Sequence, residues 1–314
     1  MQDADMFWQM ISRNMALLTL VFAIAAYVFP SVFLVLKDYF LGFFAATMFA
    51  LGLVMQPKEA KSALARPATI GIGVATQYIA MPLLGFCAAS IATWQGASPA
   101  IALGFIIVAC APGAMASNVI SYLLGGSIAF SIAFSIAMTL VATLLSPFLT
   151  PFLTQWLGGA YMAIPWLPMM KTIAITVMAP LLAGMVLRHF TNQHEAHYER
   201  IAPAIAAISI IVICSYAVAA NQSRIADTPW VVFLLVVLLN AGGYGIGWLV
   251  ASISHFDRTY RITLAIEIGM QNAGLGVALA LKHFSPESAL PGALFAVWCI
   301  LTAAGLSRWC HKAP

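Results

Sequence analysis

The chain has 314 residues, of which 62% are hydrophobic and only 8% are charged. A soluble domain is roughly half apolar and about 25% charged, so this composition excludes the water-soluble class and predicts an all-α polytopic membrane protein. The net charge of +4 gives no indication of nucleic-acid binding, because the basic residues cluster where the loops of a membrane protein are expected to be basic.

Ten apolar runs, each bounded by charged residues, proline or glycine, predict ten membrane-spanning helices. In chain order the predicted spans are residues 14–36, 39–56, 67–93, 99–125, 127–157, 168–190, 201–221, 229–254, 259–284 and 288–310. Several are longer than the roughly 20 residues that cross a bilayer, so we expect tilted, broken or re-entrant segments among them. The first run lacks the small-residue cleavage site of a signal peptide, so we expect it to be a retained helix.

The basic residues predict the orientation of the chain in the membrane. If the N-terminus is cytoplasmic, ten of the 14 lysines and arginines fall on the cytoplasmic side. These ten are Arg13, Lys58, Lys61, Arg66, Arg188, Arg200, Arg258, Arg261, Arg308 and Lys312. The positive-inside rule therefore predicts a multi-pass protein of the inner (cytoplasmic) membrane, with an even number of spans and both termini in the cytoplasm.

Polar residues interrupt spans three and four. Span three has Gln77 at the centre of GVATQYIAMP (residues 73–82). Span four contains CAPGAMASNVISYLLGG (residues 110–126), a helical run broken by proline and glycine, with the polar pair Ser117 and Asn118 near its middle. A broken transmembrane segment frees backbone carbonyls and helix ends, which can then hold ions or substrate.

Span five carries a hydroxyl side chain on every fourth residue near its start. These residues are Ser127, Ser131, Ser135 and Thr139. At this spacing they form one stripe on one helix face. Small polar residues in such a stripe commonly serve close helix packing, and here they can also supply oxygen ligands beside Ser117 and Asn118. Taken alone, the stripe leaves both interpretations open.

Span nine, which contains EIGMQNAGLGVALA (residues 267–280), repeats the pattern of span four, with Gln271 and Asn272 as its polar pair. Five spans separate the two runs, and an odd number of spans inverts the topology. The runs are therefore expected at corresponding positions of two inverted halves, which is where the binding site of a transporter lies. Two ordinary kinked helices with a few interhelical hydrogen bonds are the alternative, which leaves the glutamate of span nine unexplained.

Glu267 is the one acidic residue of the ten that is predicted to lie inside the membrane. A bare carboxylate at that depth costs roughly 2.5 to 3.5 kcal/mol. No basic residue falls near the middle of any predicted span to form a salt bridge with it, so a bound cation or a proton is needed to neutralise it. Because the surrounding polar groups are all oxygen donors, they suit a hard monovalent cation such as sodium better than a transition metal.

The cysteines and histidines indicate neither a metal centre nor catalysis. Five cysteines occur singly in or beside apolar runs, and we expect them to be buried apolar residues. They are Cys87, Cys110, Cys214, Cys299 and Cys310. The run HEAH (residues 194–197) is too short for the zinc motif HExxH, and the chain lacks the paired groups of the other intramembrane proteases, so an enzyme is not expected.

Three motifs resemble the bile acid:sodium symporter family: PGAMASNVISYL (residues 112–123), LAIEIGMQNAGLGVAL (residues 264–279) and PGALFAVW (residues 291–298). The resemblance extends over nearly the whole chain. It implies ten transmembrane helices arranged as two inverted five-helix repeats, residues 1–160 and 161–314. Spans 1, 2, 6 and 7 would form a panel, and spans 3–5 and 8–10 a core in which the broken spans four and nine cross.

The resemblance also implies two sodium ions that share one carboxylate. The first sodium site would use Ser117, Asn118, Ser131, Ser135 and Glu267. The second would use the side chains of Gln77, Glu267 and Gln271 with the backbone carbonyls of Ile268 and Met270. On this hypothesis the chain is a monomeric symporter in the lipid bilayer that couples sodium to an organic anion. A proton-coupled carrier with Glu267 as the proton site remains the alternative.

The substrate side differs from the family pattern. Related bacterial sequences have threonine where this chain has Met115, and a His-Asn pair where it has Cys299 and Ile300. Asn272 and the N-terminal end of the half-helix that begins near Ala116 remain to hold a substrate, and helix N-termini favour anions. The expected substrate is a small carboxylate such as pantoate or a related 2-oxo or 2-hydroxy acid, or an amphipathic anion like a bile acid.

Overall fold

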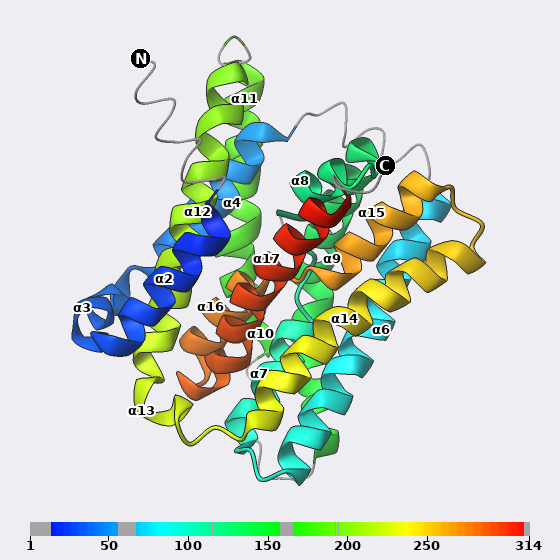
Figure 1. The fold of residues 1–314 in the computed structure, drawn as a ribbon. Coiled ribbons are helices and arrows are strands. Elements are labelled where there is room, and N and C mark those ends of the chain that lie inside the picture. The colour runs from blue at the N-terminus through cyan, green and yellow to red at the C-terminus, as the bar shows by residue number, and fades with distance from the viewer. Residues whose placement is uncertain are drawn as a thin grey trace.

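The computed structural model describes residues 14–55, 67–114, 116–157, 166–191, 193 and 195–310. Across these residues the chain is helical and forms no β-strand, which confirms the all-α prediction (Figure 1). The helices are α2 (Met15–Val28), α3 (Pro30–Leu34), α4 (Phe40–Val54), α6 (Pro67–Trp94), α7 (Pro99–Ala109), α8 (Ala116–Leu123), α9 (Ile128–Thr154), α10 (Trp166–Ile173), α11 (Ala179–Phe190), α12 (Glu195–Ala220), α13 (Gln222–Ile225), α14 (Trp230–Ile253), α15 (Arg258–Gly269), α16 (Ala273–His283) and α17 (Leu290–Cys310).

Five of these helical segments are long and apolar enough to cross a membrane, and one bent pair would make a sixth. The five are residues 67–94, 128–157, 166–190, 196–220 and 230–253. Shorter apolar helices cover residues 40–54, 99–109 and 287–303. The structure thus supports a multi-pass membrane protein, and ten crossings stay a prediction.

The two interrupted spans are broken where the sequence predicts. The first break separates α7, which ends at Ala109, from α8, which begins at Ala116, and the second, residues 270–272, separates α15 from α16. Pro112 contributes to the first break because a proline has no amide hydrogen to donate to the preceding turn. In the second break Met270 is extended, with φ −96° and ψ 99°, and the side chain of Asn272 caps α16.

The first predicted span is wrong as a single helix. The chain turns by 109° between residues 17–28 and residues 30–38. Phe29, at the turn, has φ −123° and ψ 62°, outside the helical region. The physical reason is Pro30, whose ring clashes with a helical conformation of the residue before it.

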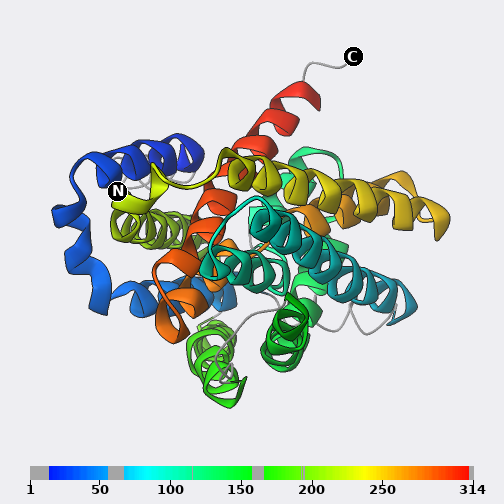
Figure 2. The same ribbon diagram turned by 90° about the horizontal axis from the view of Figure 1, so that it is seen from below.

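The helices form two packed groups, which lie on opposite sides in Figure 1, and Figure 2 shows the same helices from below. In one group α4 packs against α11 and α12, and α12 packs against α2. In the other, α6 packs against α7, α9 and α14, and α14 packs against α15. Glycines permit these close contacts: a side chain at Gly52 of α4 would meet the carbonyl of Leu181 on α11 at 2.1 Å. Small residues allow helices in a membrane to approach in this way.

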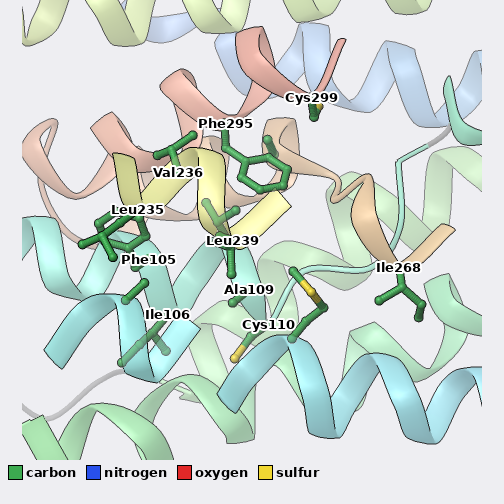
Figure 3. Close-up of a cluster of buried hydrophobic side chains, with 14 of the residues drawn as sticks. Phe105, Ile106, Ala109, Cys110, Leu235, Val236, Leu239, Ile268, Phe295 and Cys299 are labelled. Atoms are coloured by element: carbon green, nitrogen blue, oxygen red, sulfur yellow. The ribbon is translucent and has the colours of Figure 1, made fainter. Parts of the chain in front are cut away.

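A hydrophobic core centred on the second group includes three of the expected buried cysteines, Cys110, Cys214 and Cys299. Figure 3 shows Cys110 and Cys299 among apolar side chains from α7, α14, α15 and α17. Cys87 is exposed on α6, so the expectation is wrong for that residue, and the side chain of Cys310 lies outside the described part of the chain.

Candidate functional site

The breaks in the two interrupted spans meet and bond to each other. The amide of Ala114 donates to the carbonyl of Met270 at 2.7 Å, and the amide of Asn272 donates to the carbonyl of Pro112 at 2.7 Å. These bonds form an isolated antiparallel bridge at the crossing. Backbone groups that leave a helix at membrane depth need such partners, because lipid offers none. The crossing therefore fixes the ends of four half-helices around one point.

Glu267 lies beside this crossing and is completely buried. The hydroxyl of Ser117 on α8 donates to its Oε1 at 2.7 Å. On α9 the hydroxyl of Ser131 donates to Oε1, and that of Ser135 donates to Oε2 at 3.2 Å. Helix α15 places the carboxylate, while the first turn of α8 and one face of α9 place the three hydroxyls.

Asn118 completes this cluster. Its side-chain oxygen accepts from Ser131 at 2.7 Å and lies 3.4 Å from the hydroxyl of Ser135. The structure therefore brings together all five side chains of the first predicted sodium set. The rest of the hydroxyl stripe differs: the side chain of Ser127 caps α9, and Thr139 donates to the carbonyl of Ser135 at 2.8 Å. Half of the stripe faces the carboxylate and half stabilises the helix itself.

The oxygens of this cluster outnumber its protons. Each of the three hydroxyls has one proton but faces two acceptor oxygens. Ser117, for example, is 2.5 Å from the carbonyl of Ala114 and 2.7 Å from Glu267 Oε1. Six contacts share three protons, and a proton on the carboxyl group would add only one. A cation that coordinates these oxygens would satisfy the remainder.

Gly113 permits the close approach of the first break to the carboxylate. A Cβ atom at this position would lie 3.1 Å from both Oε2 and the carbonyl oxygen of Glu267. The donors gathered here are hydroxyl, amide, carbonyl and carboxylate oxygens, which suit a hard cation. Across the described residues no group of three or more His, Cys, Asp or Glu side chains is placed to hold a metal.

The second predicted sodium set is assembled around two paired amides. Gln77 and Gln271 are buried, and the amide nitrogen of Gln77 donates to the side-chain oxygen of Gln271 at 2.7 Å and to the carbonyl of Ala111 at 2.9 Å. Gln271 donates to the carbonyl of Ile268 at 2.6 Å. The carbonyl of Met270 accepts from the amide of Ala114 in the first break. Among the described residues no hydrogen bond joins the Glu267 carboxylate to either glutamine, and its part in this set stays a prediction.

A narrow pocket lies next to the crossing. Four of the five predicted substrate residues line it: Ala116, Asn272, Cys299 and Ile300. The fifth, Met115, lies outside the described residues. Gly274 and two members of the second predicted sodium set, Met270 and Gln271, also line the pocket. The lining residues that sequence reasoning missed are Phe44, Thr47, Ala114, Ile210, Ala273 and Ala296. Most of these are apolar, and nothing in the sequence marks them as lining residues. Thr47 has a hydroxyl group, but it is a single polar residue in an apolar run.

Asn272 and two helix N-termini give this pocket its polar character. The side-chain oxygen of Asn272 accepts from the amide of Leu275 at 3.0 Å, while its amide nitrogen makes no hydrogen bond within the described part of the chain. Helices α8 and α16 both begin at the pocket, with Ala116 and Ala273. Because helix N-termini carry partial positive charge and free amides, this end of the pocket favours an anion.

Asn240 is a buried polar residue near the crossing that sequence reasoning missed. Its amide donates to the carbonyl of Gly269 at 2.8 Å, and its oxygen accepts from the hydroxyl of Thr302 at 3.0 Å. Its position in its helix matches that of Gln77: Asn240 is the eleventh residue of α14, and Gln77 is the eleventh residue of α6. Each of these residues donates to a carbonyl where a half-helix ends.

Comparison with known proteins gives the family. The model of the Sodium Bile acid symporter family matches residues 41–228. The chain is 34% identical to an uncharacterized sodium-dependent transporter, YocS, of Bacillus subtilis over 93% of this chain and 89% of that protein. It is 34% identical to the probable chloroplastic sodium/metabolite cotransporter BASS1 of Oryza sativa over 80% of this chain and 60% of that protein. It is 28% identical to the human ileal sodium/bile acid cotransporter over 77% and 69% of the two chains.

These relatives are named as transporters or cotransporters, which confirms the prediction of a transporter rather than an enzyme. The family match covers more than half of the chain and includes the motif around the first break. The chain belongs to the sodium bile acid symporter family.

Proposed function

We propose that this protein is a secondary active transporter that couples the movement of sodium to that of an organic anion by alternating access. The observation that carries the proposal is the buried carboxylate of Glu267, which is surrounded by three hydroxyls. An ionised carboxylate without a basic partner at this depth is unfavourable. A sodium ion bound by Glu267, Ser117, Asn118, Ser131 and Ser135 would neutralise it.

Sodium is favoured over the proton as the coupling ion. A proton on Glu267 neutralises its charge, but some of the six contacts between hydroxyl and acceptor oxygens would still have no proton between the two oxygens. A cation can be coordinated by all of these oxygens at once. The relatives of this chain are also named as sodium-dependent transporters or sodium cotransporters. Proton coupling remains the competing hypothesis, and replacement of sodium by potassium at fixed pH separates the two.

A second sodium ion is proposed at the Gln77 and Gln271 pair. The amide oxygens of both side chains and the carbonyls of Ile268 and Met270 are gathered there. This ion would share the carboxylate of Glu267 with the first. Two sodium ions that enter with one carboxylate carry a net positive charge, which gains roughly 2.3 kcal/mol per 100 mV of membrane potential.

The proposed substrate is an organic anion bound between the two groups of helices. Phe44 of α4 and Ile210 of α12 line the pocket together with Asn272. Two helix N-termini and the free amide nitrogen of Asn272 would hold a carboxylate, while apolar side chains would contact its organic part. A small carboxylate such as pantoate or a 2-oxo acid, or a bile-acid-like anion, has this chemistry.

The proposed architecture is two inverted five-helix repeats, residues 1–160 and 161–314, with both termini in the cytoplasm of a monomer in the inner membrane. Three observations support the repeats: the two breaks bond to each other, Gln77 and Asn240 occupy the same position in α6 and α14, and the helices form two groups. The group of α2, α4, α11 and α12 would be the panel. The distribution of lysine and arginine supports the orientation.

Thermal unfolding of the purified full chain in NaCl or KCl at equal ionic strength tests the ion. Sodium should stabilise the wild-type protein, by about 2.7 kcal/mol when its concentration is 100 times the dissociation constant. Glu267→Gln should remove this stabilisation while the protein stays folded, and Glu199→Gln, at an exposed site on α12, should not. If Glu267→Gln keeps the full sodium effect, the assignment fails.

The same measurement with a panel of small carboxylates tests the substrate. A carboxylate that stabilises the protein only when sodium is present would identify both partners, because coupled ligands raise each other's affinity. Stabilisation that follows pH and is the same in NaCl and KCl would support proton coupling instead.

A further inference from the structure

A second layer of hydroxyl residues lies one helical turn from the Glu267 cluster. Ser121 follows Ser117 by four residues on α8, and Thr263 precedes Glu267 by four residues on α15. Residues four apart lie one above the other on the same helix face. Since Ser117 bonds to Glu267, the antiparallel run of α8 and α15 places Ser121 level with Thr263.

Helix α9 confirms this register. Ser131 on α9 bonds to Glu267, and four residues earlier the amide of Ser127 donates to the hydroxyl oxygen of Thr263 at 2.8 Å. The second layer therefore lies where α8 ends and where α9 and α15 begin. This is the end of the molecule at which α8 and α15 are labelled in Figure 1.

Gly126 packs tightly against two oxygen atoms of this layer. Its amide donates to the carbonyl of Ser121 at 2.7 Å. A Cβ atom on Gly126 would lie 2.7 Å from the hydroxyl oxygen of Thr263 and 2.9 Å from that carbonyl oxygen. Both ligand-type oxygens therefore lie next to the same residue, in the connection between α8 and α9.

Ser121 supplies the observation that points to a ligand. Its side chain is fully buried, and its hydroxyl has no hydrogen-bond partner among the described residues. Buried hydroxyls in folded proteins are almost always paired. Ser121 lies one turn from Ser117 on the same face of α8, at the level of Thr263.

The layer also lies between the buried site and the surface. Glu267, Ser121 and Thr263 are buried, whereas Gly126 and Ser127 in the connection to α9 are only half-buried. An ion that moves from Glu267 toward this end of the protein would meet the second layer next. The end is cytoplasmic in the orientation proposed above.

We propose that Ser121 and Thr263 form a transient sodium site through which an ion leaves the Glu267 cluster toward the connection between α8 and α9. The inference rests on the proposed function, because it needs sodium at Glu267. Its ligands are two hydroxyls and the carbonyl of Ser121. Without a carboxylate they hold a monovalent cation weakly, so the ion stops briefly and moves on to water.

Release of ²²Na⁺ from the purified full chain tests this site. Protein on scintillation beads is loaded with ²²Na⁺ and diluted into potassium buffer at low temperature, and a titration of the same beads gives the sodium half-saturation. Ser121→Ala and Thr263→Val should each slow release by about tenfold, because the ion loses one oxygen ligand on its path. The half-saturation should not change, since the Glu267 cluster is intact.

Conservative variants separate this role from packing. Ser121→Thr and Thr263→Ser keep the hydroxyl and should keep the wild-type release rate. The matched control is Ser215→Ala on α12, which removes another buried hydroxyl without a partner among the described residues and should leave release unchanged.

Three outcomes overturn the proposal. An unchanged release rate in both hydroxyl-deleting variants would mean that ions leave by another route. A half-saturation that shifts in proportion to the rate would place these residues in the Glu267 site itself. If the wild-type chain binds no ²²Na⁺, the proposed function fails, which distinguishes that failure from the failure of the exit site alone.

Discussion

Gln77 and Asn240 occupy the same position in two helices and bond to the two breaks in the same way. Gln77 donates to the carbonyl of Ala111 at 2.9 Å, and Asn240 donates to the carbonyl of Gly269 at 2.8 Å. In each case a side chain from the preceding long helix satisfies a carbonyl at the end of a half-helix. Such a carbonyl has no helical partner, and in a membrane it needs a protein donor.

Asn240→Leu is therefore expected to destabilise the protein. The change removes the donor to Gly269 and the acceptor for the hydroxyl of Thr302. At roughly 0.6 to 1.7 kcal/mol for each interhelical hydrogen bond in a membrane protein, the loss should be about 1 to 3 kcal/mol. The measurement is the thermal unfolding midpoint without sodium. Thr302→Val removes the bond between Thr302 and Asn240 but keeps the bond from Asn240 to Gly269, so it should have a smaller effect. Equal stability of Asn240→Leu and wild type would contradict the prediction.

Gly113→Ala should weaken sodium binding while the chain still folds. The new methyl group would lie 3.1 Å from the carboxylate and the carbonyl of Glu267, so these oxygens must move by a few tenths of an ångström. Ion sites tolerate such displacement poorly, and we expect the sodium half-saturation in the thermal assay to rise by about tenfold. Gly274→Ala is the matched control, because its methyl group would have ordinary contacts, 3.5 Å or more from its neighbours. A parallel shift in both variants would disprove the geometric explanation.

Gln77→Ala should reduce the cooperativity of sodium binding. The variant removes one of the two amides of the proposed second site and leaves the hydroxyl cluster around Glu267 in place. If two ions bind to the wild-type protein, the Hill slope of sodium-dependent stabilisation should fall from near two toward one. Thr76→Ala, on the same helix, removes a hydroxyl that bonds only to the carbonyl of Ile72 and should preserve the slope. A slope that stays the same in Gln77→Ala would assign Gln77 to packing alone.

The breaks could be predicted from the sequence because they are local: proline and glycine in span four mark a break wherever the helix lies. A lone intramembrane glutamate indicates that oxygen, cation or proton partners are needed, but which side chains surround it depends on how α8, α9 and α15 pack. The complete ligand set of Glu267 and the pairing of Gln77 with Gln271 therefore came through family resemblance. Asn240 was missed because one amide in an apolar run does not identify its partner.

Two errors have physical explanations. Hydropathy predicted the first span as one helix, whereas the restriction that Pro30 places on Phe29 bends the chain by 109°. The expectation that every cysteine is buried applies to proteins in water; Cys87 is exposed on α6, and in a bilayer an apolar side chain gains little by turning inward. Apolar lining residues such as Phe44 and Ile210 could not be found by searching for polar groups.

The residues that differ from the family pattern should set substrate preference. Met115→Thr, Cys299→His and Ile300→Asn, made together, restore the polar groups of related bacterial sequences, and Cys299 and Ile300 line the pocket. None of the three belongs to the Glu267 cluster, so the sodium half-saturation without substrate should stay unchanged. The substrate found in the carboxylate screen should bind less well, because new buried donors would lack partners. Each unpaired group costs about 1 to 3 kcal/mol, so the substrate half-saturation should rise by about tenfold or more. Cys87→Ser, at an exposed position outside the pocket, is the control. If the triple variant binds the same substrate with unchanged half-saturation, these positions do not determine specificity.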